Sequence, residues 1–466
     1  TTYHYNSGGD PEHIPDLSYE QLKAFYASHY HPSNAIFMTF GDIPAAEHHA
    51  VFEERALNKF HKLDQRIQVQ AEQRLKHPLR VERSYAYDEN GATENKTHIV
   101  LAWLLGESTD LESLLEAQLL ASVLLDNSAS PLQQALETSS LGQAPSPLCG
   151  LEDSMREMVF CCGIEGSEAE SADAVESMIL DVLERVATDG IDHDRMEAVL
   201  HQLELHQREI SGDGYPYGLQ LILQALGCAT HYSDPIAVLD LEPVISRLRT
   251  RIGDPSYIRK LTRQLLLDNS HRVTLVMKPD TELSARRAAA ESERLAAIKA
   301  GMNPAARAET VQLAQDLAAR QQQADDETVL PKVELSDVPD SLPELAYRES
   351  NPRGIPITSY SQGTNGLVYQ QLVTPLPLLE PAQLATLPLY TQVMTELGLG
   401  PRDYLETQHR QSATVGSING FSSMRGAVAN EQAVSGYLAL SSKALLSKDC
   451  LLYTSPSPRD QRPKLV

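Results

Sequence analysis

Hydrophobic and polar positions near the start of the chain repeat with the period of a helix. Ser18 and Gln21 stand in the S-x-x-Q order of a capping box, and apolar residues then recur at helical spacing. This pattern predicts a helix over about residues 19–29. His31 precedes Pro32, which disfavours helical geometry and indicates that the helix stops before it.

A continuous apolar run follows this helix. The run "AIFMTF" at Ala35–Phe40 predicts a buried strand, closed by a Gly-Asp turn. Pro44 is suited to open a second helix, which we expect to run to about Phe60. The polar stretch at 65–78 predicts a linker.

A second region, from about Arg80, alternates strand and helix patterns. Its predicted elements are a strand at Thr97–Leu105, a helix at about Leu111–Leu125, a strand at Met155–Ile164, a helix at about Ala172–Ala187, further helices including His193–Ile210, and a strand at His271–Met277. The closing "HRVTLVMKPD" resembles the earlier "NAIFMTFGDIP", because each joins a buried strand to a turn with an Asp. This similarity indicates a faint internal repeat of a whole domain.

The composition changes between residues 281 and 323, where Ala, Arg, Glu and Gln dominate. Gly301 suits the position just after a helix, and Asn303 with Pro304 supplies the N-cap and first turn of another. These signals predict a helical hairpin, followed by an acidic, proline-bearing linker at 324–343.

A third region has about half as many predicted elements as the second. They are a strand at Gly366–Val373, a helix at Pro388–Leu397 ended by Gly398, a helix at Arg402–Gln411, and strands at Thr414–Ile418 and Val434–Leu440. The final "CLLYTSPSPRD" is the translation of a transposase adaptor used in shotgun sequencing. We therefore expect Cys450–Val466 to be a non-native tail.

The chain has 466 residues, a net charge of −24 and five cysteines. This length suits two or three domains. The charge argues against nucleic acid and anionic membranes as partners, since both favour clustered Lys and Arg, and a basic or unstructured peptide fits better. No apolar run approaches the ~20 residues of a membrane helix. We expect no disulfide framework and a reducing compartment, because no C-x-x-C pair occurs and adjacent strand cysteines point to opposite faces. The cysteines are Cys149, Cys161, Cys162, Cys228 and Cys450.

Fifteen histidines raise the question of a metal site. The helical motifs H-E-x-x-H and H-x-x-E-H both need two histidines four residues apart, so that both rings leave one helix face. No two histidines of this sequence have that separation, which excludes both motifs within it.

The nearest approach to such a motif is "HQLELH", with His201, Glu204 and His206. Residues five apart lie ~140° around a helix, so these histidines cannot bind one ion from a continuous helix. We expect them to be solvated or half-buried. "EHH" at 47–49 diverges similarly, and His29 is interpreted as a hydrogen-bonded core or boundary residue.

Other catalytic signatures are equally weak. No G-x-S-x-G elbow occurs. "GLGPRD" at Gly398–Asp403 lacks the Lys of a phosphate loop and is interpreted as a helix C-cap, and "SGGDP" at Ser7–Pro11 as a turn. Taken alone, these residues indicate a multi-domain α plus β protein without a self-contained active site.

Several phrases nevertheless resemble a known family. "SGGDPEHIPDLSYEQLKAFYASHYHPSNAIFMTFGD" is similar to the end of the first domain of the presequence protease branch of the pitrilysin and insulysin superfamily of zinc metallopeptidases. "HRVTLVMKPD", "TNGLVYQQLV" and "TELGLGPRDYLE" continue the resemblance, which extends over about Thr1–Lys448. It implies an α+β fold of repeated domains, each with a mixed β-sheet covered by helices, joined by a helical hairpin.

The resemblance also implies a domain plan for an internal fragment. The expected parts are the C-terminal tail of the first, catalytic domain at 1–62, a linker at 63–79, a second α+β domain at 80–279, a helical hairpin hinge at 280–326, an incomplete third α+β domain at 327–449, and the adaptor-derived tail at 450–466. We expect the truncated third domain to be unstable without its missing strands.

For the intact parent, the resemblance implies zinc-dependent endoproteolysis of short unfolded peptides in a closed chamber, with Zn²⁺ activating water and a Glu moving the proton. The zinc ligands of the family precede "SGGDP", so no catalytic, metal or cofactor-binding residue is assigned here, and we expect the fragment to be inactive and zinc-free. The alternative is a non-catalytic structural or binding homologue. We expect basic peptides as partners, a monomeric parent with two halves, and a location in the cytoplasm of a bacterium or the mitochondrial matrix or plastid of a eukaryote.

Overall fold

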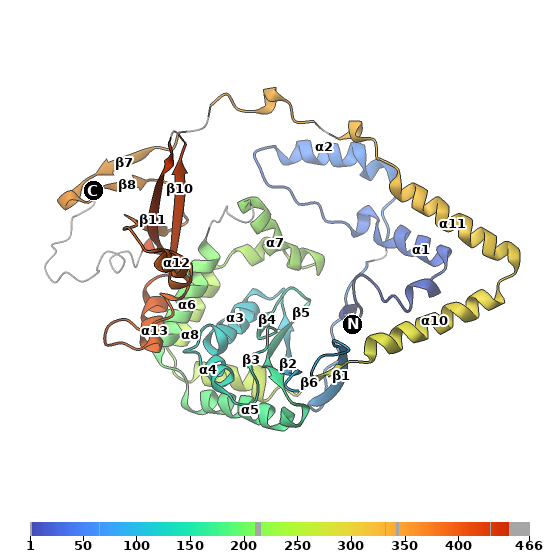
Figure 1. Ribbon diagram of the computed structural model, residues 1–466, viewed down its shortest axis with the longest axis horizontal. Coiled ribbons are helices and arrows are strands. Elements are labelled where there is room, and N and C mark those ends of the chain that lie inside the picture. Colours follow the sequence, from blue (N-terminus) through green and yellow to red (C-terminus); the bar gives the residue numbers. More distant parts are fainter. Residues whose placement is uncertain are drawn as a thin grey trace. The chain divides into compact units, whose positions relative to one another are not determined.

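The computed structural model describes residues 2–64, 66–209, 216–330, 332–341, 344–428 and 430–446. The chain divides into two compact units. One is formed by residues 1–85, 90–280 and 364–466, and the other by residues 86–89 and 281–363 (Figure 1). The predicted adaptor tail, Cys450–Val466, lies outside the described residues.

Helix α1 (Tyr19–His29) begins where the capping box predicts. Ser18 Oγ accepts a hydrogen bond from the Gln21 backbone N–H, and the Gln21 side chain accepts one from the Ser18 backbone N–H. These reciprocal bonds satisfy two donors that the helix itself leaves unpaired. The chain then leaves the helix, and His31 is extended before Pro32 with φ −120° and ψ 143°. The prediction for this helix is confirmed.

The buried strand predicted at Ala35–Phe40 is wrong. These residues form no strand, and Ile36 and Phe37 are 44% and 47% exposed. A strand needs a neighbour to satisfy its backbone groups, and none of the described residues pairs with this segment. The proposed repeat therefore lacks its first strand in this structure. Helix α2 (Ala45–Arg55) follows Pro44 but ends before Phe60, because Ala56 leaves helical geometry at φ −129°.

A larger sheet forms the centre of the first unit. Its strand order is β1-β6-β2-β5-β3, and β4 also pairs with β5. The strands are β1 (Leu79–Ala86), β2 (Thr97–Glu107), β3 (Ala144–Pro145), β4 (Gly150–Glu152), β5 (Glu157–Ser167) and β6 (Arg272–Asp280). Strand β2 runs antiparallel to both of its neighbours, and Leu101 lies opposite Cys162 on one side and Thr274 on the other.

Alternate residues of β2 enter the core. Ile99, Leu101 and Trp103 are fully buried, as expected for a strand with one face against helices. The indole N–H of Trp103 donates to the Leu266 carbonyl at 2.9 Å, which satisfies its one polar group. Gly163 on β5 permits the close pairing, since a Cβ there would lie 2.1 Å from the Ile99 oxygen.

Seven helices of the same unit accompany this sheet among the described residues (Figure 1). They are α3 (Leu111–Leu125), α4 (Pro131–Thr138), α5 (Ala172–Asp189), α6 (His193–Arg208), α7 (Tyr217–Thr230), α8 (Glu242–Ile252) and α9 (Tyr257–Thr262). The predicted strands and helices of this region are confirmed within a few residues at their ends, because their apolar periodicity matches the faces that the core buries.

A second sheet belongs to the same unit, with the order β10-β11-β9. It contains β9 (Leu367–Pro375), β10 (Ser417–Ala427) and β11 (Asn430–Leu445), accompanied by α12 (Pro381–Val393) and α13 (Tyr404–Thr414). The prediction that Pro388 opens a helix is wrong. A capping box of Glu380 and Gln383 starts α12 earlier in the chain, and Pro388 lies inside the helix.

The turn "GLGPRD" also differs from its interpretation as a helix C-cap. Helix α12 ends before it, with Met394 as its C-cap, and Gly398 begins the turn that leads into α13. Leu399 and Arg402 form an isolated bridge across this turn. A Cβ on Gly398 would lie 2.6 Å from the Arg402 oxygen, so close backbone approach explains the glycine. "SGGDP" is a turn as predicted, with Gly9 at φ +81°.

The smaller unit contains the predicted helical hairpin. Helices α10 (Leu283–Gly301) and α11 (Pro304–Gln322) are both present, and Asn303 caps α11 by accepting from the Ala306 N–H at 2.9 Å. Gly301 is the last residue of α10 rather than the residue after it, because the chain turns through the extended Met302. The unit also holds the hairpin of β7 (Tyr347–Ser350) and β8 (Ile357–Tyr360).

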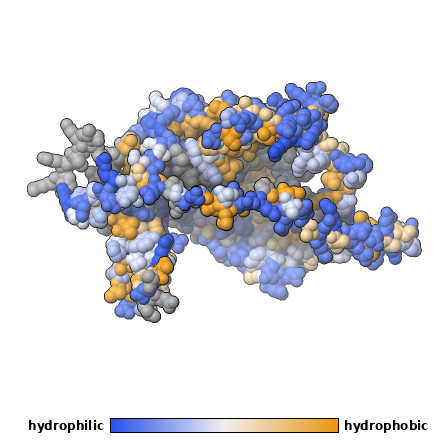
Figure 2. All heavy atoms as spheres, turned by 90° about the horizontal axis from the view of Figure 1, so that it is seen from above, coloured by the Kyte–Doolittle hydropathy of each residue, from blue (hydrophilic) through white to orange (hydrophobic). Residues whose placement is uncertain are grey.

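The predicted α+β class, with sheets accompanied by helices, is confirmed. Among the described helices, none combines the length and the apolar character that crossing a bilayer requires. Figure 2 shows hydrophobic residues interspersed with hydrophilic ones on the face that it draws. Large apolar side chains are exposed on α1 in particular, where Leu22, Phe25 and Tyr26 are 56%, 54% and 62% exposed.

Candidate functional site

The histidines near α1 have structural surroundings. The ring of His29 stacks on Phe25 with centroids 3.7 Å apart, and its Nδ1 lies 3.0 Å from the Phe25 carbonyl oxygen. His29 is half-buried, so its interpretation as a hydrogen-bonded boundary residue is confirmed. His31 Nδ1 accepts a hydrogen bond from the Ser33 backbone N–H at 3.1 Å and caps the turn that follows.

The "HQLELH" residues on α6 are separated as the helical geometry predicts, but their burial differs. His206 is exposed, whereas His201 and Glu204 are only 2% and 7% exposed, so the expectation of solvated or half-buried residues is wrong for these two. The reason is that α6 is packed on more than one face. Glu204 is held there by Arg208 and Arg249, at 2.8 and 2.6 Å.

These residues do not fit a zinc ion. Both carboxylate oxygens of Glu204 accept from arginines, and an arginine-bound carboxylate is a poor metal ligand. Within the described part of the chain, no three His, Cys, Asp or Glu side chains are grouped so as to hold a metal. We therefore derive no chemical step through zinc from the residues of this chain.

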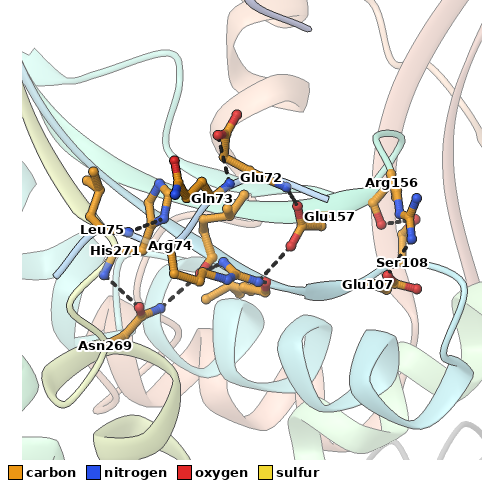
Figure 3. Close-up of polar contacts among 12 residues, drawn as sticks. Glu72, Gln73, Arg74, Leu75, Glu107, Ser108, Arg156, Glu157, Asn269 and His271 are labelled. Atoms are coloured by element: carbon orange, nitrogen blue, oxygen red, sulfur yellow. Dashed lines mark hydrogen bonds and ion pairs between the residues drawn. The ribbon is translucent and has the colours of Figure 1, made fainter. Parts of the chain in front are cut away.

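The densest polar network lies where the predicted linker crosses the end of the larger sheet. Residues 66–75, which we call the strap, contain neither helix nor strand. Figure 3 shows Arg74 of the strap directed toward Glu157 at the start of β5, and Leu75 beside His271. The strap therefore lies against the sheet through side-chain contacts rather than as an additional strand.

Glu157 joins two parts of the strap. Its Oε2 accepts from the Glu72 backbone N–H at 2.6 Å, and its Oε1 accepts from Arg74 Nη2 at 2.7 Å. The side chain of Glu157 is 9% exposed and that of Arg74 is 46% exposed. Arg74 also donates to the Leu104 and Leu105 carbonyls at 3.0 and 2.6 Å. One guanidinium thus binds the end of β2 and a buried carboxylate together.

His271 holds the end of the strap. The Leu75 backbone N–H donates to His271 Nδ1 at 3.2 Å, and Ser270 Oγ donates to the Leu75 carbonyl at 2.6 Å. Burial, and then the charge of Arg74, lower the pKa of His271 below its usual 6.5. The neutral ring fits the geometry, because only an unprotonated Nδ1 can accept this bond.

The start of the strap is fastened by aromatic and arginine side chains. Tyr232 Oη donates to the Ile67 carbonyl at 2.7 Å, and its ring lies 3.9 Å from the Arg66 guanidinium carbon. Arg156 donates to the Val69 carbonyl and is paired with Glu107. Successive attachments therefore run from Ile67 to Leu75, and they fix the path between the first 64 residues and the larger sheet.

Two cavities of the larger unit were also considered. One of about 560 Å³ lies at the α5–α6 and α8–α9 connections, lined by residues 189–196 and 252–259. Another of about 630 Å³ lies beside α6 and α13. Arg195 contributes to both, but it donates to the Ala129 carbonyl, so its charge is already engaged. Neither cavity suggests a reaction by the chemistry of its lining.

The described cysteines are free thiols in apolar surroundings. Burial raises the pKa of Cys161 to about 11 and that of Cys162 well above its usual value. High pKa values leave little thiolate, so these residues are poor nucleophiles. Cys161 and Cys162 alternate on β5, with Cys162 in the core, as their adjacency predicts.

Sequence reasoning missed the strap as a site. Arg74 and Glu157 are 83 residues apart, and each looks like an ordinary charged residue in its local pattern. The one available signal was weak: the polar stretch at 65–78 contains no Gly or Ser run of the kind that marks a freely flexible linker.

Two family models match the chain. The Peptidase M16 inactive domain model matches residues 16–203. The model of the associated domain found in subfamily C of the M16 peptidases matches residues 277–450. The first match includes the strap and most of the larger sheet, and the second includes the helical hairpin and the smaller sheet.

Curated relatives agree with these models. The chain is 32% identical over 420 residues to the mitochondrial presequence protease of Xenopus tropicalis, a match that covers 90% of this chain and 41% of that protein. It is 30% identical over 437 residues to presequence protease 1, chloroplastic/mitochondrial, of Arabidopsis thaliana, which covers 91% of this chain and 40% of the relative. The chain thus spans about two fifths of the length of these relatives.

Among solved structures, a protease from Helicobacter pylori matches with a TM-score of 0.43 at 14% identity, covering 59% of this chain and 62% of that one. The two family models and the presequence protease relatives together place the chain: it belongs to the peptidase M16 family.

Proposed function

We propose that this chain is part of a zinc metalloendopeptidase of the presequence protease type, which degrades short unfolded peptides in a closed chamber. The observation that carries the proposal is the 32% identity over 420 residues with the Xenopus tropicalis presequence protease. The chain spans about two fifths of that relative, and its described residues do not fit a zinc site. The proposed contribution of this chain is therefore chamber wall and hinge.

The domain plan forms part of the proposal. It assigns 1–62 to the end of the first domain, 63–79 to a connection, 80–279 to a second domain, 280–326 to the hinge, and 327–449 to an incomplete third domain. The exposed apolar side chains of α1 support the first assignment, because they suit packing against further parts of a first domain. Two 19-residue helices joined through Met302 and Asn303 support the hinge.

The proposed substrates are short, unfolded and basic. The net charge of −24 supports this choice, since a chamber wall with excess carboxylates attracts cationic peptides and repels anionic ones. The intact protein is proposed to be a monomer of two halves. Its proposed compartment is the mitochondrial matrix or a plastid in a eukaryote, and the cytoplasm in a bacterium; the relatives named above are mitochondrial or chloroplastic.

The first test is the gene sequence preceding this segment. The proposal expects H-x-x-E-H followed by a Glu ligand, the residues that hold and use zinc in such enzymes. A preceding domain without those residues would refute the protease and favour a non-catalytic structural or binding homologue.

A second test uses the chain itself. Purified protein is assayed for bound zinc and for cleavage of a quenched-fluorescent basic peptide, with and without a chelator, beside an acidic peptide of equal length. The proposal expects no stoichiometric zinc and no cleavage by this chain. Robust chelator-sensitive cleavage would show that the reacting groups lie in it and would overturn the assignment.

A further inference from the structure

Helix α6 presents two different faces to two parts of the larger unit. Met196 and Leu200 are buried in the core beneath the larger sheet. Gln202, Leu205 and Glu209 follow at spacings of three and four, so they share one side of the helix and of its C-terminal residue. That side contacts residues 364–446.

Gln202 caps the end of α13. Its Nε2 donates to the Ser412 carbonyl at 2.6 Å and to the Val415 carbonyl at 2.7 Å. The last carbonyls of a helix have no partner within the helix, so a side-chain donor at this point satisfies them. The end of α13 thereby depends on a residue more than 200 positions earlier in the chain.

A small apolar contact lies beside this cap. Leu205, Leu367 and Leu445 form a buried cluster of their own, with exposures of 1%, 3% and 6%. Gly416 makes room for it, because a Cβ there would lie 3.1 Å from Leu205 Cδ1 and 3.0 Å from Lys443 Cγ. The cluster is separate from the core under the larger sheet.

The rim of the contact is polar and partly wet. Lys443 Nζ lies 2.5 Å from Glu209 Oε2, with about a quarter of each side chain exposed. Asn365 Nδ2 donates to the Arg208 carbonyl at 3.1 Å. Water can replace each of these contacts when the surfaces separate.

We propose that this contact, Gln202, Leu205 and Glu209 against residues 364–446, is a latch that opens reversibly while both sides stay folded. Each side has its own sheet and its own buried residues, and the contact between them contains only a small apolar cluster with a polar rim. Residues 281–363, which form the other compact unit, keep the two sides connected when the latch is open. The latch does not depend on the proposed function; under that function, its opening would widen the peptide chamber.

The test is hydrogen exchange of the chain with Gln202→Ala, compared with Gln207→Ala as a matched control on the same helix. We expect amides of residues 404–415 to exchange about tenfold faster with Gln202→Ala, the effect of losing two neutral hydrogen bonds. Amides of α3, in the core of the larger sheet, should keep their rates. Gln207→Ala should change neither region.

Charge variants supply an independent measurement. Glu209→Lys and Lys443→Glu should each speed exchange over residues 404–415, and combining them should restore protection. An unchanged rate with Gln202→Ala would overturn the latch. Equal acceleration of α3 and residues 404–415 would also overturn it, because the contact would then belong to one cooperative core. The readout needs no catalysis, so its failure is distinguishable from failure of the protease proposal.

Discussion

Replacing Glu157 with Gln should release the strap from the end of the larger sheet. Glu157 accepts from the Glu72 backbone N–H at 2.6 Å and from Arg74 at 2.7 Å, and its side chain is 9% exposed. Gln has nearly the same shape but no charge, and its amide group places a donor toward Arg74. The change therefore removes the charge-assisted bonds without opening a cavity.

The magnitude follows from the two bonds. A hydrogen bond to a charged group contributes roughly 1.5–3 kcal/mol. The Arg74 bond is discounted to less than about 1 kcal/mol because Arg74 is 46% exposed, and Gln can still accept from Glu72. The sum is a loss of about 2 kcal/mol, which corresponds to about a 30-fold rise in the released fraction of the strap.

Hydrogen exchange over residues 66–78, together with trypsin cleavage after Arg66 and Arg74, measures that fraction. Glu170→Gln, an exposed carboxylate in the turn before α5, is the matched control and should behave as wild type. The reasoning is refuted if Glu157→Gln leaves both exchange and cleavage at the control level. An Arg74→Met variant completes a double-mutant cycle, in which the two changes should cost less together than their sum.

Three further predictions concern pH and packing. Lowering the pH below 6.5 should progressively weaken the hold of His271 on Leu75, because its pKa is lowered in the folded state and that stability is fully present only above 6.5; exchange of the strap against pH, flattened in His271→Gln, measures this. Gly163→Ala should cost about 3 kcal/mol or more in denaturant unfolding, since its Cβ would meet backbone, whereas Gly227→Ala in open space should be nearly neutral. Burial alone would raise the pKa of Glu176, but neighbouring arginine and threonine side chains lower it overall, so Glu176→Gln should cost about 1 kcal/mol at neutral pH. Unfolding titrations should show that difference shrink as the pH falls below about 4.5.

Most local elements were predictable because their signals are short-range. The capping box at Ser18 and the N-cap at Asn303 act within one helical turn, and both helices begin where these residues predict. The alternation in β2 likewise records which residues face the core. The misplaced start of α12 shows the limit of such signals, since a capping box at Glu380 outweighed the proline inside the helix.

Long-range features could not be predicted in the same way. Ala35–Phe40 has the composition of a buried strand, but a strand depends on a partner that its own residues do not specify. The burial of Glu204 depends on Arg249, 45 residues away, and the strap depends on a carboxylate 83 residues from Arg74. The candidate site therefore lay in residues whose local patterns looked unremarkable for a surface.

The amino-acid order alone determined where helices start, which strand faces are apolar, and that no paired-histidine zinc motif occurs in this chain, because each depends on residues within a few positions of one another. Only the tertiary structure decided that a polar linker is a fastened strap and that Gln202 caps α13. Both depend on hydrogen bonds between distant segments, whose free energy is gained only when folding brings donor and acceptor within about 3 Å.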